Sequence, residues 1–541
     1  MRVAKVNSIF VKKIRDENTK VVCRRHEVHA AAAAFKARFL TGPELRGGVG
    51  GEQQGRGRRS VAAGKMGRSA SGPLVLWGTG DINEDQISLL GFVGGVLRVR
   101  MLVFQALLVF LITIIETQWS SVSGMYCADM ASTVYRPHSV TITEFGAVGD
   151  GVTLNTKAFQ NAIFYLNSFA DKGGAQLFVP AGRWLTGGFS LISHLTLSLD
   201  KDAVIIGSPC LNVALLVGAN GTIDGQGAIW WDWFHNNTLN YTRPHLVELM
   251  YSTNVVISNL TFKNSPFWNI HPVYCSQVIV EHVTILAPLN SPNTDGINPD
   301  SSTNVCISHC YVRNGDDVIV IKSGWDEYGI SFAQPSSNIS ISNITGETRG
   351  GAGIAIGSEM SGGISEVRAE GLRIVNSLHG IRIKTAPGRG GYVRNVYIAN
   401  VSMHNVSMAI RINGNYGEHP DNNYDRNALP IISNITIQNV VGVDVGVAGI
   451  LEGIEGDNFS SICISNVSLS VQSRHPWNCS LIQGYSNSVT PESCEQLRTD
   501  CEETSICYDG GSSLAVGSRA SIHNKPSANI LLNSLLQLVS L

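Results

Sequence analysis

A short strand-like pattern recurs along the second half of the chain. The segments NVVISNLTF, QVIVEHVTI, NVCISHCYV, NISISNITG, NVYIANVSM, NITIQNVVG and SICISNVSL each alternate β-branched and polar residues, and they start 23 to 57 residues apart. Short alternating strands at such an interval are typical of a solenoid. We therefore predict an all-β fold, a parallel β-helix whose turns are lined by Asn. A β-sandwich is the alternative, but it favours the shorter spacing of hairpins.

Charge is distributed unevenly along the 541 residues. Residues 1–100 hold 18 of the 40 basic residues but only 8 of the 42 acidic ones, so the remainder of the chain is acidic. An acidic body is a poor candidate for nucleic-acid binding. Residues 1–100 also lack any core-building periodicity, and we expect a low-complexity or disordered extension there.

The run MLVFQALLVFLITII at 101–115 is uncharged, follows RVR and precedes a Ser/Gly-rich exit. This pattern predicts a signal peptide over 101–124, or a membrane anchor if the run stays uncleaved, with Met101 as the working start. A buried core helix is the alternative. We expect the catalytic β-helix domain at 136–508 and a loose C-terminal tail at 509–541.

Two other features favour export to the cell wall or extracellular space. About a dozen Asn-X-Ser/Thr sequons occur, among them Asn236, Asn240, Asn259, Asn343, Asn400 and Asn466. Four cysteines near the C-terminus suggest a disulfide framework without fixing its connectivity: Cys479, Cys494, Cys501 and Cys507. The pair Cys306 and Cys310 lacks a second metal-binding pair, so we interpret it as structural.

Two adjacent carboxylates, Asp316 and Asp317, stand at the entrance to the apolar run 318–321. Asp295 lies 21 and 22 residues earlier, about one coil of the predicted solenoid. Three carboxylates would then meet on adjacent coils and could hold protons unequally, as acid–base catalysis needs. Both aspartates can face one surface only if Gly315 helps to form a bend, because consecutive strand residues point to opposite faces. Ordinary turn chemistry is the alternative.

Two cations follow further along the chain. Arg382 and Lys384 differ by two positions, so a strand would place them on one face. Carboxylates followed by cations, coil after coil, indicate a groove for a charged polymer. The alternative is a solvated strand face. For His271, about one coil before Asp295, a structural role is the simpler interpretation.

The motifs NTD at 293–295, GDD at 315–317 and RIK at 382–384, in this order, resemble glycoside hydrolase family 28, the polygalacturonases. The resemblance covers roughly 136 to 490 and begins with TITEFGAVGDGVTLNTKAFQNAI. The segments GIAIGSEMSGGI and HPDNNYDRNALP look most like a plant branch related to exo-acting enzymes. The resemblance implies a right-handed parallel β-helix that hydrolyses α-1,4-galacturonide bonds of pectin by inverting single displacement.

The resemblance also implies the roles of the catalytic residues. Asp316 would be the general acid, Asp295 and Asp317 would hold and activate the attacking water, and Asn293 would help to position it. Acid and base in an inverting glycosidase stand about 6.5–9.5 Å apart, which leaves room for that water.

The substrate-binding residues follow in the same way. Arg382 and Lys384 would bind a galacturonate carboxylate near the cleavage point, and Tyr416 matches a tyrosine of the same subsite. The resemblance implies no cofactor and no metal. We expect a monomer whose partner is polygalacturonate.

The chain departs from the family pattern at two positions. The family has a histidine in the coil after GDD, where this chain reads TRGGAGIAIGS and places Gly351 or Ala352. The usual Cys after GDD is Val318. Two alternatives therefore stand beside the hydrolase: a catalytically impaired pectin-binding wall protein, and a pectate-lyase-type β-helix enzyme.

Overall fold

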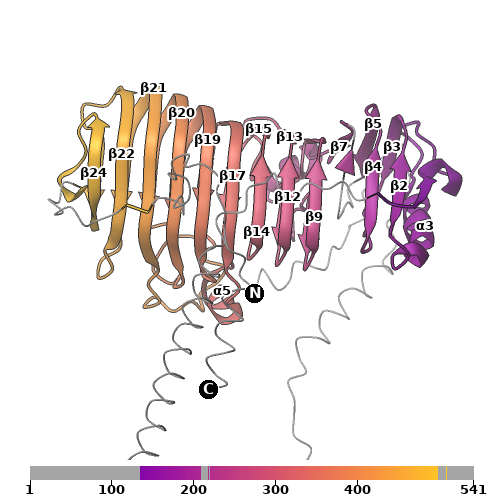
Figure 1. The fold of residues 1–541 in the computed structure, drawn as a ribbon, viewed down its shortest axis with the longest axis horizontal. Helices are drawn as coiled ribbons and strands as arrows, with labels where there is room; N and C mark the ends of the chain where they lie inside the picture. The colour runs from indigo at the N-terminus through magenta and orange to yellow at the C-terminus, as the bar shows by residue number, and fades with distance from the viewer. Residues whose placement is uncertain (1–134, 209–216, 219, 498–506, 509–541) are drawn as a thin grey trace, which may run out of the picture. The chain divides into compact units, whose positions relative to one another are not determined.

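The structure is a computed structural model that describes residues 135–208, 217–218, 220–497 and 507–508. Parallel strands stack one after another along the long axis (Figure 1). The strands of this region are β1 (His138–Thr141), β2 (Ala175–Val179), β3 (Gly182–Thr186), β4 (Leu195–Leu199), β5 (Ala203–Gly207), β6 (Val217–Gly218), β7 (Thr222–Asp224), β8 (Val247–Met250), β9 (Thr253–Ser258), β10 (Thr261–Lys263), β11 (Ile270–Val273), β12 (Ser276–Glu281), β13 (Thr284–Leu286), β14 (Thr303–Ser308), β15 (Tyr311–Asn314), β16 (Ile319–Ile321), β17 (Ser336–Thr348), β18 (Ala352–Ile356), β19 (Ile364–Lys384), β20 (Tyr392–Asn413), β21 (Ile431–Glu452), β22 (Phe459–Val471), β23 (Trp477–Ser480) and β24 (Ile482–Thr490). The helical segments are η3 (Ile142–Phe145), α3 (Thr156–Leu166), η4 (Asn167–Phe169), α4 (Ala228–His235), α5 (Asp326–Phe332) and η5 (Glu495–Leu497).

The strands form three parallel ladders that run from coil to coil. One ladder follows β1, β2, β4, β6, β9, β12, β14 and β17, then continues through β19 to β22 and ends at β24. A second follows β3, β5, β7, β10, β13, β15 and β17. The third joins β8 to β11, crosses short bridges to β16 and β18, and continues through the ends of β19 to β21 to β23. This arrangement confirms the predicted parallel β-helix.

The core follows from the register of these ladders. Val305 of β14 pairs with Val278 on the coil before and with Ile339 on the coil after. All three side chains are buried. The parallel register therefore stacks apolar side chains of one coil on those of the next, and the alternation within each strand gives one continuous apolar interior.

Asparagines line the bends between ladders, as the sequence predicts. Asn304 and Asn338 both have positive φ, a conformation that Asn tolerates better than most residues. The amide of Asn338 donates to Oδ1 of Asn304 over 2.7 Å, and the amide of Asn466 donates in the same way to Asn439 over 2.8 Å. These bonds satisfy side-chain amides from one coil to the next.

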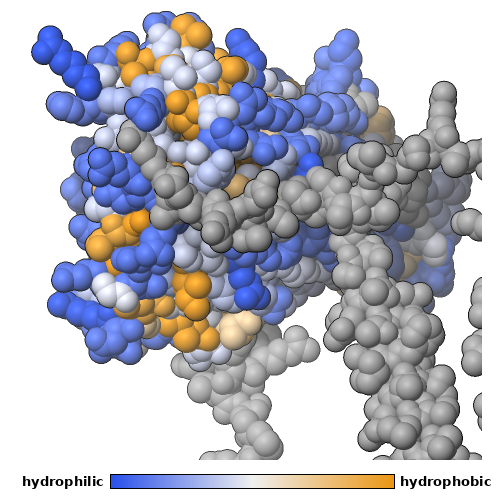
Figure 2. Space-filling view, turned by 60° about the vertical axis from the view of Figure 1, so that its left-hand side comes forward, coloured by the Kyte–Doolittle hydropathy of each residue, from blue (hydrophilic) through white to orange (hydrophobic). Residues whose placement is uncertain are grey.

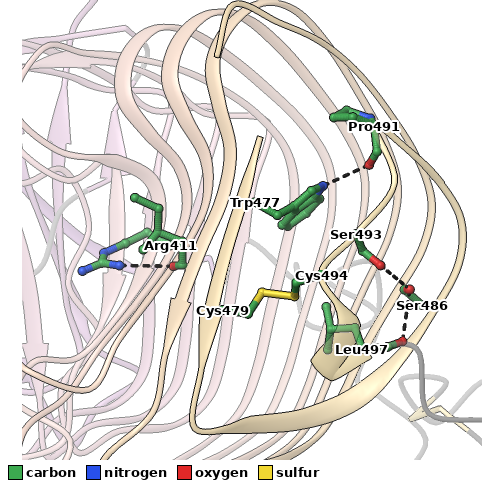
Figure 3. Close-up of a disulfide and its surroundings, with 9 residues drawn as sticks. Arg411, Trp477, Cys479, Ser486, Pro491, Ser493, Cys494 and Leu497 are labelled. Atoms are coloured by element: carbon green, nitrogen blue, oxygen red, sulfur yellow. Dashed lines mark hydrogen bonds between the residues drawn. A yellow bond between two sulfur atoms is a disulfide. The ribbon is translucent and has the colours of Figure 1, made fainter. Parts of the chain in front are cut away.

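The C-terminal coils are closed by η5 and a disulfide. Cys479 bonds to Cys494, and Leu497 packs into the interior beside them (Figure 3). Trp477 covers this end and donates its indole N–H to the carbonyl of Pro491. From this end the surface is mainly hydrophilic with small hydrophobic patches (Figure 2).

The described residues show the bonding state of most of the cysteines singled out in the sequence. A second disulfide joins Cys463 to Cys507, and Cys306 is also disulfide-bonded, whereas Cys310 is a free, buried thiol. Cys501 lies outside the described residues, as do the N-terminal extension, the proposed signal and the tail at 509–541. In the described region no helix is long and apolar enough to cross a membrane.

Candidate active site

The two adjacent aspartates lie in the connection between β15 and β16, not inside a strand. Gly315 precedes them, and a Cβ at this position would lie 1.9 Å from the carbonyl oxygen of Ser291. Only glycine therefore allows the chain to pass so close to the preceding coil. The bend that the sequence requires is present, and it lets Asp316 and Asp317 approach the same group of side chains.

Asp295 lies on the coil directly before this bend. The backbone N–H of Gly296 donates to the carbonyl of Asp317 over 2.9 Å, and Ile297 forms a bridge with Ile319. The third ladder therefore holds the backbones of the two coils in register. This brings together the three carboxylates that the sequence singles out.

Asp317 is an ionised carboxylate with fixed partners. It is 1% exposed, accepts a hydrogen bond from the Lys384 ammonium over 2.7 Å, and accepts another from the backbone N–H of Ala352 over 2.8 Å. Burial alone would raise the pKa of Asp317, but the charge and hydrogen bond of Lys384 outweigh it and hold that pKa below its usual value. Both of its oxygens are thus engaged by donors.

Asp316 has the opposite electrostatic state. Burial, reinforced by the negative charge of Asp317, raises the pKa of Asp316 to about 6. One oxygen accepts the backbone N–H of Asp317 over 2.9 Å, and the other accepts the side-chain amide of Asn293 over 3.3 Å. Asp316 therefore keeps a proton in mildly acidic solution while its neighbour in sequence is charged.

Asp295 also has a raised pKa. It is 4% exposed, and burial together with the charge of Asp316 raises its pKa well above the usual value. The amide of Asn298 donates to one of its oxygens over 3.1 Å. Because the charge of Asp316 disfavours ionisation of Asp295, the two carboxyls titrate as a unit and hold one proton over a range of pH.

The predicted substrate-binding residues meet at one end of this cluster. The guanidinium of Arg382 lies 5.4 Å from the ring centre of Tyr416, and the ammonium of Lys384 lies 5.6 Å from it. Arg382 is partly exposed, whereas Lys384 is buried against Asp317. Of the two cations, Arg382 is thus better placed to contact a ligand from solvent.

Arg243 is a site residue that the sequence analysis missed. Its guanidinium donates to Oδ1 of Asn293 over 2.6 Å and to the carbonyls of Pro292 and Pro266. Asn293 in turn donates to Asp316, so Arg243 fixes the amide that orients the acid. Arg243 comes 50 residues before Asn293, and no local pattern links the two.

Lys322 is a second missed residue. It is buried, forms an ion pair of 2.8 Å with Glu359, and its charge also acts on the pKa of all three aspartates. Its position directly after the short strand β16, which Asp316 and Asp317 precede, could have indicated that it lies near the carboxylates.

Ala352 is one of the two positions at which the family histidine is expected. Ala352 of β18 donates its N–H to Asp317 and packs beside Val320 and Ala355. On the next coil His379 pairs with Ala352 in register, and Nδ1 of this buried imidazole has no hydrogen-bond partner within the described residues. Burial, aided by the charge of Arg382, lowers the pKa of His379 to about 4. A neutral imidazole thus stands one coil beyond Ala352.

Comparison with known families agrees with this geometry. Residues 194–494 match the model of the glycosyl hydrolases family 28. A probable polygalacturonase of Vitis vinifera is 46% identical over 417 residues, which span 70% of this chain and 85% of the relative. A polygalacturonase of Chamaecyparis obtusa is 29% identical, with 66% of this chain and 72% of the relative covered.

Two solved structures of polygalacturonases are similar to this chain. An exopolygalacturonase from Thermotoga maritima superposes with a TM-score of 0.59 at 27% identity, covering 67% of this chain and 94% of that one. The polygalacturonase of Erwinia carotovora superposes with a TM-score of 0.51 at 24% identity, which shows a shared fold.

Proposed function

Because the chain belongs to the glycosyl hydrolases family 28 and is a polygalacturonase-like glycoside hydrolase, we propose that it hydrolyses α-1,4-galacturonide bonds of pectin with inversion of configuration. The observation that carries this proposal is the unequal protonation of adjacent carboxylates. Asp316 has a pKa of about 6, while Lys384 keeps Asp317 ionised. Glycoside hydrolysis requires a carboxylic acid and a carboxylate in one site.

In the proposed reaction Asp316 transfers its proton to the glycosidic oxygen as the bond from that oxygen to the anomeric carbon breaks. Asn293, held by Arg243, orients the acid. Water attacks the anomeric carbon from the opposite face and loses a proton to the carboxylate of Asp295. Asp317 supplies permanent negative charge beside the positive charge that develops on the sugar.

The reactive form carries one proton on the pair of Asp295 and Asp316, placed on Asp316. A second proton would occupy the base, and loss of the only proton would remove the acid. The pKa of both carboxyls is raised, that of Asp295 by burial and the charge of Asp316 and that of Asp316 by burial and the charge of Asp317, which supports a pair that holds a single proton; the arrangement with that proton on Asp316 is the reactive one. Activity that falls on both sides of an acidic optimum is the expected consequence.

The substrate would be recognised through its carboxylates. Arg382 is partly exposed, and Tyr416 offers a ring beside it, so a galacturonate carboxylate can meet a guanidinium donor next to the reacting bond. Esterification removes that negative charge. We therefore propose free rather than methyl-esterified galacturonate as the preferred residue at this position.

Product analysis separates this proposal from its alternatives. Purified protein incubated with polygalacturonate should release reducing ends without absorbance from a 4,5-unsaturated uronide. An unsaturated product would indicate a lyase instead. Binding of the polymer with no product of either kind would indicate the impaired wall protein.

We also propose that the enzyme acts outside the cell, in the wall. The disulfides Cys463–Cys507 and Cys479–Cys494 support an oxidising compartment. Sequencing the mature N-terminus of protein isolated from its native tissue tests this proposal, because cleavage after the apolar run at 101–115 is expected.

A further inference from the structure

A cluster of histidines and carboxylates lies on the coils before Asp295, and the proposed reaction does not use it. Glu248 of β8 pairs in register with His271 of β11, and His245 precedes β8 by two residues. One donor atom from each of the three side chains lies within 4.8 Å of the other two. Their sequence separation reflects one coil of the solenoid, so the register of the strands builds the cluster.

One carboxylate oxygen of Glu248 lies close to both imidazoles. Oε1 of Glu248 lies 3.2 Å from Nδ1 of His245 and 3.5 Å from Nδ1 of His271. Ligands bound to zinc at about 2.0–2.1 Å in a tetrahedron stand about 3.3 Å apart. His271 is buried, yet neither of its ring nitrogens makes a hydrogen bond within the described residues. Each nitrogen instead faces a carboxylate at ion-pair distance, Nδ1 toward Glu248 and Nε2 toward Asp300.

The surroundings hold the donors in place. Oδ2 of Asp300 lies 3.6 Å from Nε2 of His271, on the side of the ring away from Glu248. Metal-bound histidines commonly have such a carboxylate behind them, which fixes the ring and leaves the other nitrogen for the metal. The ring of His245 stacks on Trp268 with centroids 5.0 Å apart. The cluster is therefore preorganised.

We propose that His245, Glu248 and His271 form a binding site for one divalent transition-metal ion of the zinc class. Two imidazoles and one carboxylate match the ligand preference of such ions, and a water would complete the coordination. Calcium and magnesium prefer sets of oxygen ligands and are poorly served by a single carboxylate. Glu248 is 29% exposed, so an ion can enter from solvent. The ion takes no part in the hydrolytic reaction.

The site lies next to the catalytic carboxylates along the third ladder. Ile270 forms a bridge with Ile297, so the neighbouring residue His271 lies one coil before Asn298, which holds Asp295. An ion here would order the coil on which Asp295 depends. Its binding can be measured without any pectic substrate.

The test titrates the metal-depleted full-length protein with ZnCl2 by isothermal titration calorimetry, and in parallel with CaCl2. We expect one zinc per chain, no comparable uptake of calcium, and visible absorption typical of tetrahedral cobalt when CoCl2 replaces zinc. Glu248→Gln and His271→Asn should abolish this binding. Asp300→Asn should weaken it about tenfold, because it removes only the carboxylate behind His271.

His404→Asn is the matched control, because His404 also lies 3.6 Å from a carboxylate, that of Asp444, but both are largely exposed. It should leave zinc binding unchanged. Glu248→Gln keeps the shape of a partly exposed side chain, so it tests zinc binding even if His271→Asn does not fold. Absence of zinc binding, or binding that survives Glu248→Gln, would overturn the proposal and leave a proton-linked cluster. Pectin hydrolysis by the metal-free protein would not be affected by that result.

Discussion

The ammonium of Lys384 lies 2.7 Å from the carboxylate of Asp317, and both side chains are shielded from solvent. This ion pair joins β19 to the bend after β15 across 67 residues of sequence. It keeps one carboxylate charged beside another that holds a proton. The chemistry of the site depends on that difference.

Lys384→Met should destabilise the protein most at neutral pH. Asp317 has a lowered pKa, so its contribution to stability is present above its unfolded pKa and is lost as pH falls through the folded value. Without Lys384 a buried charge loses its partner, and the free energy of unfolding should fall by about 3–5 kcal/mol at pH 7. Urea denaturation at pH 7 and in acid measures the difference, which should shrink in acid. Arg368→Met, which breaks a partly exposed pair with Glu370, should cost less than about 1 kcal/mol. Equal losses in the two variants would contradict the account.

Arg243→Met should reduce kcat far more than it changes KM. Arg243 holds Asn293, and Asn293 holds the acid, so its loss releases Asp316 from a fixed orientation. Misplacement of a catalytic group by about 1 Å can cost on the order of 100-fold in rate. Steady-state kinetics on polygalacturonate check this, with Arg313→Met as the control, because Arg313 forms a more exposed pair with Glu347. A merely structural role would lower thermal stability and leave kcat of the folded fraction intact.

Removal of the disulfide between Cys479 and Cys494 should loosen the C-terminal end of the solenoid. The bond closes a loop of 15 residues, for which the chain-entropy model gives about 3 kcal/mol. The double variant Cys479→Ala with Cys494→Ala should therefore unfold at lower denaturant concentration. Cys310→Ala is the control variant, because it breaks no disulfide. Because the active carboxylates lie many coils away, kcat at low temperature should stay unchanged. A large loss of kcat would point to long-range coupling.

The pH dependence of kcat/KM should be bell-shaped. The alkaline limb should lie near or above pH 6, where the pair of Asp295 and Asp316 loses its shared proton, since the pKa of Asp316 is raised to about 6 and that of Asp295 is also raised. The acidic limb reports a second proton entering the carboxylate cluster. Asp317→Asn removes a negative charge that raises the pKa of Asp316, so the residual activity should show its alkaline limb at lower pH. A limb that stays in place would show that another group controls it.

Much of the fold could be predicted because the same local sequence pattern recurs in each coil of the solenoid. Each coil brings its own alternating strand and its own Asn bend, so local patterns suffice. The carboxylate cluster was also predictable, since Asp295 and Asp316 are separated by one coil. Arg243 and His379 were not, because their partners are fixed by the register of ladders and not by spacing within a motif. The cluster of His245, Glu248 and His271 was not predicted either, although Glu248 and His271 also lie one coil apart, because no motif in the sequence links them.

If Asp316 protonates the leaving oxygen, its loss should matter little for a substrate with a good leaving group. Such a substrate needs little protonation, so an aryl galacturonide should be cleaved by Asp316→Asn at a much larger fraction of the wild-type rate than polygalacturonate is. Asp295→Asn and Asp317→Asn should lose activity on both substrates, because each removes charge or base that the aryl substrate still needs. Thermal unfolding of all three variants checks that each is folded. Asp316→Asn alone should be rescued by the aryl substrate; rescue of Asp295→Asn instead would assign the acid to Asp295 and rule out Asp316 in that role.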